Sequence, residues 1–179
     1  MSKKSVFLAL ASVVCLALFL TTSCATLKDK ITKRDSRTPI KTVMVTGNFT
    51  EPRLICELAQ YRNQAPLIIF MPAENGADPR MFYLSGNKQA EEMPVADFAK
   101  FLDFLNPKVV IFLGGDAFCP QKYIEMASSQ FRVYTVTGPD WVKNAQSMGD
   151  ILAQPRLLRE YKDAMERLAK TGQLPPNAK

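Results

Sequence analysis

The side chains in this sequence that could do chemistry gather in short segments rich in turn residues. The segment "KVVIFLGGDAFCP" carries an apolar run, Val109 to Leu113, straight into Gly114-Gly115-Asp116. Such a run, bounded by turn residues, is typical of a strand buried on both faces of a parallel sheet. Glycines that follow such a strand allow the backbone to approach another group closely. The sequence therefore predicts a close contact at this point, with either a ligand or the next element of the fold.

Other predicted strands end in similar residues, for example Gly47-Asn48-Phe49-Thr50. In open parallel α/β sheets, ligands bind beyond the carboxyl ends of the strands. We therefore expect ligand-binding candidates there, although βα turns use the same residue types for backbone reasons. Trp141, the single tryptophan, is expected either to fill the core or to stack on a sugar ring. The candidates are Asn48, Thr50, Asn75, Gly114, Gly115, Asp116, Asp140 and Trp141.

Catalytic chemistry has few candidates. Four carboxylates could be paired for glycoside cleavage or could cap helices and face water; they are those of Glu51, Glu74, Asp116 and Asp140. Cys119 lies near a predicted helix start, which can lower the pKa of a thiol. The chain has no histidine, which excludes Ser-His-Asp and Cys-His catalysis and histidine metal sites. It also lacks a P-loop and a GxGxxG motif. We expect no catalytic residue, no metal and no cofactor.

The first residues predict export. Lys3 and Lys4 precede an apolar stretch, Val6 to Leu20, which has the size of a signal-peptide core and is short for a membrane span. Small residues then lead to Cys24, and the whole resembles a bacterial lipoprotein signal, although Thr21 stands where the lipobox usually has leucine. The resemblance implies a signal peptide over residues 1–23, a lipid such as palmitate on Cys24, and a location on a membrane of the cell envelope. An ordinary cleaved signal or an uncleaved anchor are the alternatives.

The rest of the chain divides by composition. Residues 24–39 are polar and unpatterned, which is typical of a tether, and residues 173–179 are expected to form a loose tail. The net charge of +6 comes without a basic run interleaved with aromatics, so nucleic acid is not an expected partner. Cys56 and Cys119 could pair in an oxidising compartment or remain buried free thiols.

Residues 40–172 alternate strand and helix patterns. Central strands of a parallel sheet are predicted at 42–46, 66–71, 109–113 and 132–136, separated by helices, one capped by Thr50 and another by Asp140. This alternation of strands and helices predicts a single α/β domain, a Rossmann-like three-layer sandwich with a mainly parallel sheet. Residues 73–93 form an insertion in which "RMFYLS" suggests an extra strand and Gly86-Asn87 a turn.

A final amphipathic helix is predicted at 156–170. Its apolar stripe is expected to fold back over the open side of the sheet and keep the chain monomeric, or else to meet another chain. The stripe consists of Leu157, Leu158, Tyr161, Met165 and Leu168.

Three segments in order resemble the cell wall-binding repeat (type 2) of Gram-positive surface proteins. They are "VTGNFTEPRLICELAQYRNQAPLIIFMP", "LNPKVVIFLGGDAFCPQKYIEM" and "FRVYTVTGPDWVKNAQSMGDIL", which together span about residues 43–152. The resemblance implies a Rossmann-like fold and a non-catalytic role in holding proteins to an anionic envelope polymer. This chain departs from the family in carrying one repeat, in having Trp141 where an arginine is usual, and in having Asn144 in place of a threonine.

These observations predict an envelope lipoprotein whose domain binds envelope glycan or protein without catalysis. A periplasmic small-ligand-binding module is one alternative, because "NPKVVIFLGG" followed by a helix also resembles the second lobe of cobalamin- and siderophore-binding proteins. That class has two lobes, and this chain is long enough for one. A glycan hydrolase that uses two carboxylates is the other alternative.

Overall fold

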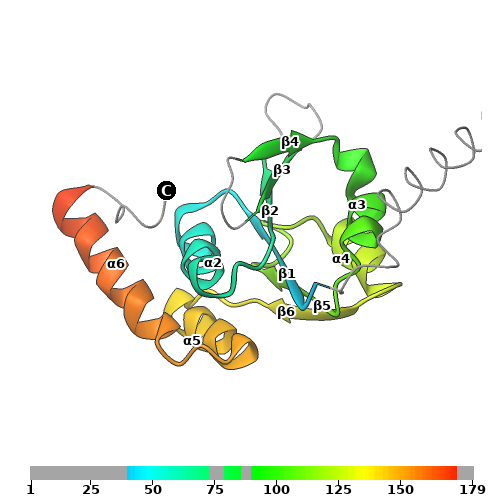
Figure 1. Cartoon of the computed structure of the whole chain (residues 1–179). Helices are drawn as coiled ribbons and strands as arrows, with labels where there is room; N and C mark the ends of the chain where they lie inside the picture. Colours follow the sequence, from blue (N-terminus) through cyan, green and yellow to red (C-terminus); the bar gives the residue numbers. More distant parts are fainter. Residues whose placement is uncertain (1–39, 73–78, 86–89, 173–179) are drawn as a thin grey trace, which may run out of the picture. The chain divides into compact units, whose positions relative to one another are not determined.

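The computed structural model describes residues 40–72, 79–85 and 90–172, all within the compact unit Pro39–Lys179. The predicted lipidation site Cys24, the candidate Asn75, the Gly86-Asn87 turn and the tail 173–179 lie outside the described residues. Strands and helices alternate along the chain, except for the consecutive strands between residues 67 and 93 and the consecutive helices at the C-terminal end (Figure 1). The elements are β1 (Thr42–Gly47), α2 (Thr50–Asn63), β2 (Leu67–Met71), β3 (Arg80–Leu84), β4 (Glu91–Met93), the 3₁₀ helix η2 (Val95–Asp97), α3 (Phe98–Leu105), β5 (Val109–Leu113), α4 (Gln121–Ser128), β6 (Arg132–Val136), α5 (Trp141–Leu152) and α6 (Leu157–Thr171).

The strands form one mixed sheet in the order β4-β3-β2-β1-β5-β6. The four predicted strands, β2, β1, β5 and β6, are parallel to one another, as the sequence predicted. The prediction that 132–136 is a central strand is wrong: β6 lies at the edge of the sheet, where only its Val136 is buried, because no further strand of the described residues covers it. β1 lies at the centre, with Val45 beside Ile68 of β2 and beside Phe112 of β5. β3 is the strand expected in the insertion, and it pairs antiparallel to β2. β4 pairs antiparallel to β3 and is an additional strand, which its exposed Glu91 and Glu92 did not indicate.

Each face of the sheet has its own hydrophobic cluster because successive strand residues point to opposite faces. Met44 of β1 packs with residues of α2, α5 and α6 on one face. Val43 and Val45 pack with residues of α3 and α4 on the other face. The result is a Rossmann-like three-layer α/β sandwich, with α3 and α4 on the side opposite α2 and α5 (Figure 1).

The two predicted helix caps have different outcomes. Asp140 caps α5, because its carboxylate accepts hydrogen bonds from the backbone N–H groups of Val142 and Lys143 at 3.0 and 3.2 Å. The prediction for Thr50 is wrong: the N-cap of α2 is Phe49, which has extended backbone and makes no side-chain cap bond. The helix begins one residue early because the carbonyl of Phe49 already accepts a hydrogen bond from the N–H of Arg53.

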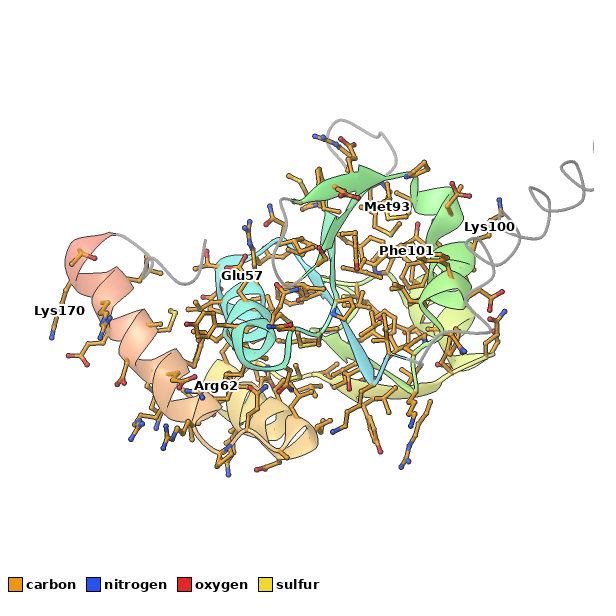
Figure 2. The ribbon with its side chains drawn as sticks, in the orientation of Figure 1. Glu57, Arg62, Met93, Lys100, Phe101 and Lys170 are labelled. Atoms are coloured by element: carbon orange, nitrogen blue, oxygen red, sulfur yellow. The ribbon has the colours of Figure 1, made fainter. Side chains whose placement is uncertain are left out.

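The final helix folds back, but onto helices instead of the sheet. α6 contacts α5 and α2, which already cover that face. Leu157, Tyr161 and Ala164 are buried in this contact, whereas Leu158 and Met165 are half-buried. Two side-chain interactions with α2 stabilise this packing of α6. The side chain of Arg62, labelled in Figure 2, donates to Glu160 of α6, and the amide of Gln154 donates to the buried carbonyl of Ala59.

Candidate functional site

The carboxyl edge of the sheet has its topological switch point between β1 and β5. The helix after β1, α2, lies on one face of the sheet, and α4, the helix after β5, lies on the other. Ligands of open α/β sheets usually bind in the crevice that opens where the chain diverges in this way. This crevice is therefore the first place to look for a site.

The crevice is occupied by the chain's own loop. A Cβ atom added at Gly47 would lie 2.6 Å from the backbone oxygen of Phe118. A Cβ atom added at Gly114, whose φ is +101°, would lie 2.7 to 2.9 Å from the Phe118 side chain. Both glycines thus leave room for Phe118. The close contact that the sequence predicted at Gly114 is a contact with the next turn of the protein itself.

Phe118 also joins an aromatic row along this edge. Its ring lies edge-on to Phe49, with ring centroids 4.8 Å apart, and edge-on to Trp141 at 5.2 Å. Such edge-to-face pairs stabilise one another beyond simple burial. Trp141 is half-buried and packs against the hydrophobic cluster, so it partly fills the core, while Phe49 remains 39% exposed. The three rings form a partly exposed apolar surface, which we call the aromatic row.

The predicted polar candidates within the described residues lie at this edge, on loops or in the first turn of a helix, but have separate surroundings. Asp140 is exposed and serves as the cap of α5, and Thr50 is exposed in the first turn of α2. Asn48 accepts a hydrogen bond from Arg53 through Oδ1 at 2.9 Å. Gly115 leaves open space, because a Cβ there would meet only a Thr137 methyl group, at 3.8 Å.

Asp116 lies beside the aromatic row. It is exposed and lines a pocket of about 220 Å³ together with Phe49 and Phe118. The other walls are apolar and include Phe70, Met71, Pro72, Pro79, Ala117 and Pro120. A carboxylate next to aromatic and proline surfaces can accept hydrogen bonds from a hydroxyl-bearing ligand while the rings contact its apolar faces.

Two of the candidate carboxylates act on the same buried phenol. Burial raises the pKa of Tyr161 on α6 to about 12, and the charges of Glu51 and Asp140 add to this effect. The phenol therefore stays protonated at neutral pH. Asp140 is already bonded to the backbone as a cap, so it is held by the fold at this position.

The two cysteines of the domain are buried free thiols on opposite faces of the sheet. Burial raises the pKa of Cys119 to about 12 and raises that of Cys56 well above its ordinary value. The Oγ1 of Thr46 donates to the carbonyl of Leu113 at 2.9 Å, and the Cys119 Sγ lies 4.0 Å from the same oxygen. A thiol that stays protonated is a poor nucleophile, so the surroundings of Cys119 do not favour a catalytic role.

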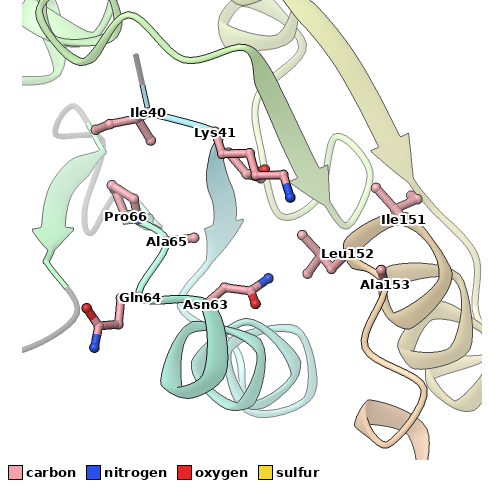
Figure 3. Close-up of a pocket in the computed structure, with 10 residues that line it drawn as sticks. Ile40, Lys41, Asn63, Gln64, Ala65, Pro66, Ile151, Leu152 and Ala153 are labelled. Atoms are coloured by element: carbon pink, nitrogen blue, oxygen red, sulfur yellow. The ribbon is translucent and has the colours of Figure 1, made fainter. Parts of the chain in front are cut away.

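A second pocket lies at the opposite, amino edge of the sheet (Figure 3). It has a volume of about 430 Å³ and is enclosed by the start of β1 and by the ends of α2 and α5. Lys41 is the charged residue among those that line it, and the others are apolar or carry neutral amides and hydroxyls. This edge is not the one at which open α/β sheets bind ligands, and we assign the pocket no function.

Metal-binding clusters, membrane-spanning helices and similar proteins provide no further indication of function. Within residues 40–72, 79–85 and 90–172, no group of three or more His, Cys, Asp or Glu side chains could hold a metal ion, and no helix is long and apolar enough to cross a membrane. A scan against protein-family models and searches of curated proteins and solved structures found no match. The resemblance to the cell wall-binding repeat therefore stays a prediction, and the described geometry carries the functional argument.

The sequence did not single out Phe118, Phe49 or Arg53, although all three are central to this edge. In the sequence, Phe118 and Phe49 simply lie next to turn residues. A signal was available in the two glycines, because Gly47 and Gly114 end neighbouring strands and must leave space for one bulky group between them.

Matched glycine substitutions test the filled crevice. We expect Gly47→Ala to lower the free energy of unfolding by about 1–3 kcal/mol, because the new methyl group would overlap the backbone oxygen of Phe118. Gly115→Ala should change it by less than about 0.5 kcal/mol, because its φ is not positive and the space is open. Urea unfolding followed by circular dichroism measures both. Equal stability of the two variants would contradict the packing described here.

Thiol reactivity tests the buried cysteines. With iodoacetamide at pH 8, we expect Cys56 and Cys119 to be alkylated at least about 100-fold more slowly in the folded protein than in urea, because both are inaccessible and protonated. Mass spectrometry of the separate peptides gives each rate. Rapid modification of Cys119 alone in the folded protein would indicate an open, activated thiol.

Proposed function

We propose that the chain is an envelope lipoprotein, anchored to a bacterial membrane through Cys24, whose domain binds cell-envelope glycan or protein partners without catalysis. The observation that carries the proposal is the aromatic row Phe49–Phe118–Trp141, with Asp116 and Asp140 on the same edge of the sheet. Ring faces and edges contact the apolar side of a sugar, and carboxylates accept hydrogen bonds from its hydroxyl groups.

The filled crevice favours a polymer over an enclosed small molecule. A small ligand is normally surrounded by its site, which buries most of its surface. Here Phe118 takes up the crevice between β1 and β5, and what remains at the aromatic row is a partly exposed surface with a pocket of about 220 Å³. A surface of this kind suits one or two units of a long chain that continues past the protein.

The packing of α6 supports a monomeric domain. The apolar stripe of α6 contacts α2 and α5 of its own chain, and Leu157 and Tyr161 are buried there. Because this contact forms within one chain, it costs none of the translational entropy that an intermolecular contact would cost.

Tryptophan fluorescence tests glycan binding at the aromatic row. Trp141 is the only tryptophan in the sequence and lies in the row, so its emission reports on this edge directly. We expect solubilised envelope polysaccharide to shift the emission of the full-length protein in detergent and to saturate. Phe49→Ala should weaken the binding about tenfold by removing an exposed ring.

Phe104→Ala is the matched control for this test. Phe104 is 41% exposed, close to the 39% of Phe49, but lies on α3, away from the row. The control should bind like the wild type. Equal losses in the two variants, or an emission unchanged by every envelope fraction, would contradict the proposed binding surface.

Metabolic labelling tests the anchor. Cells that express the wild-type chain and are fed a palmitate analogue should yield labelled protein in the membrane fraction. Cys24→Ala should abolish the label, because it removes the thiol that would carry the lipid, whereas Cys119→Ala should retain it. Equal labelling of the wild type and the Cys24 variant would refute the lipid anchor.

A further inference from the structure

A second pocket at the carboxyl edge lies beside β2 and β3, and it shares Met71 with the pocket next to the aromatic row. It has a volume of about 290 Å³, and its walls are formed by the β2–β3 ribbon and the start of α2. Ile69, Met71, Phe82, Leu84 and Ala90 make it mostly apolar, while Asn48 and Arg53 are its polar residues. Arg53 is the one charged residue among the described residues that line it. The pocket therefore combines a single cation with apolar walls.

The guanidinium of Arg53 is held from two sides. Its Nε donates to Oε1 of Glu57 at 2.6 Å, and its Nη1 donates to Oδ1 of Asn48 at 2.9 Å. Glu57, labelled on α2 in Figure 2, is only 8% exposed, so the anchoring carboxylate is part of the packed interior. Such a guanidinium has lost much of its side-chain freedom before any ligand arrives, which lowers the cost of binding.

Arg53 and Asn48 have further N–H donors besides those used in these hydrogen bonds. A guanidinium has five N–H groups in a planar fork. The Nη2 group of Arg53 and the Nδ2 group of Asn48 have no partner within residues 40–72, 79–85 and 90–172. Both residues line the pocket. Two neighbouring N–H donors on a cation and an amide match the two oxygens of a carboxylate.

Helix stability does not account for this arginine. Arg53 lies near the start of α2, where the helix dipole favours acids and disfavours cations. The ion pair also runs in the less favourable direction, because the basic residue precedes the acidic residue by four positions. Glu57 loses solvent here, and burial raises its pKa despite the bond from Arg53. The guanidinium thus occupies this place although both the helix dipole and the direction of the ion pair are locally unfavourable.

We propose that this pocket binds the carboxylate of a small amphipathic molecule, with Arg53 and Asn48 holding the carboxylate and Ile69, Met71, Phe82 and Leu84 contacting an apolar tail. One cation, already shared with Glu57, suits a singly charged group and not a phosphate dianion. The volume of about 290 Å³ suits a short tail. The site has its own polar residues, shares only Met71, among the described lining residues, with the pocket beside the aromatic row, and does not depend on the function proposed for that row.

Pentanoate is the probe that tests this site, with pentanamide as its uncharged analogue. In ¹⁵N spectra of the full-length protein in detergent micelles, pentanoate should shift the Asn48 amide and Arg53 Nε–H signals and saturate in the millimolar range or below. Pentanamide should bind at least tenfold more weakly, because it cannot pair with the guanidinium. Equal binding of the two probes would overturn the proposal.

Three variants test which residues bind pentanoate. Arg53→Gln should weaken pentanoate binding at least tenfold. Arg62→Gln removes another arginine of α2, which pairs with Glu160 of α6 outside the pocket, and should leave pentanoate binding unchanged. Asn48→Asp keeps an acceptor for Arg53 and adds a charge that repels the probe, so it should abolish binding even where Arg53→Gln fails to fold. Undiminished binding to a folded Asn48→Asp variant, or an absence of saturable shifts in the wild type, would refute the site.

Discussion

The contact between Phe118 and the two glycines Gly47 and Gly114 organises the carboxyl edge of this protein. It places a bulky ring where the ends of β1 and β5 would otherwise leave a crevice. Because the ring then meets Phe49 on one side and Trp141 on the other, three loops are held in one arrangement. The polar residues of this edge are consequently displayed around an apolar centre instead of lining one crevice between β1 and β5.

The edge carries two chemical environments. One is the aromatic row with the exposed carboxylates of Asp116 and Asp140, and its pocket reaches Phe70 and Met71 of β2. The other is a pocket beside β2 and β3 with one fixed guanidinium. The antiparallel strand β3 is what makes the second environment possible, because it extends the sheet past α2 and supplies Phe82 and Leu84 as a wall. The insertion therefore adds a surface that the parallel core alone would not have.

Sequence patterns predicted the central fold well because burial on both faces leaves a strong signal. The runs at β1, β2 and β5 are apolar almost throughout, and the helices between the strands fix a parallel arrangement. The edge strand β6 carries the exposed Arg132 and Thr135 and was recognised by its β-rich composition instead. β4 escaped prediction because its Glu91 and Glu92 are exposed at the sheet edge and carry no periodic pattern. The cap of α2 was misplaced because Thr50 has the preferred side chain, whereas the contact of Phe49 with Phe118 is a tertiary effect. The described site candidates lie at the carboxyl edge, where the sequence placed them, but the contacts of Phe118 and Arg53 join segments whose proximity residue spacing does not reveal.

The central position of β1 has a consequence for the order of folding. β1 pairs with β2 across one helix, but its other neighbour, β5, follows only after β3, β4 and α3. The bond from Thr46 to Leu113 spans 67 positions of the chain, and closing so long a loop is slow compared with forming local structure. The loop that carries Phe118 follows β5 directly, so the aromatic row cannot assemble before this long-range pairing. The edge that we propose as functional thus belongs to the late, high-contact-order part of the folding reaction, and a chain that has not completed it has no assembled row to present.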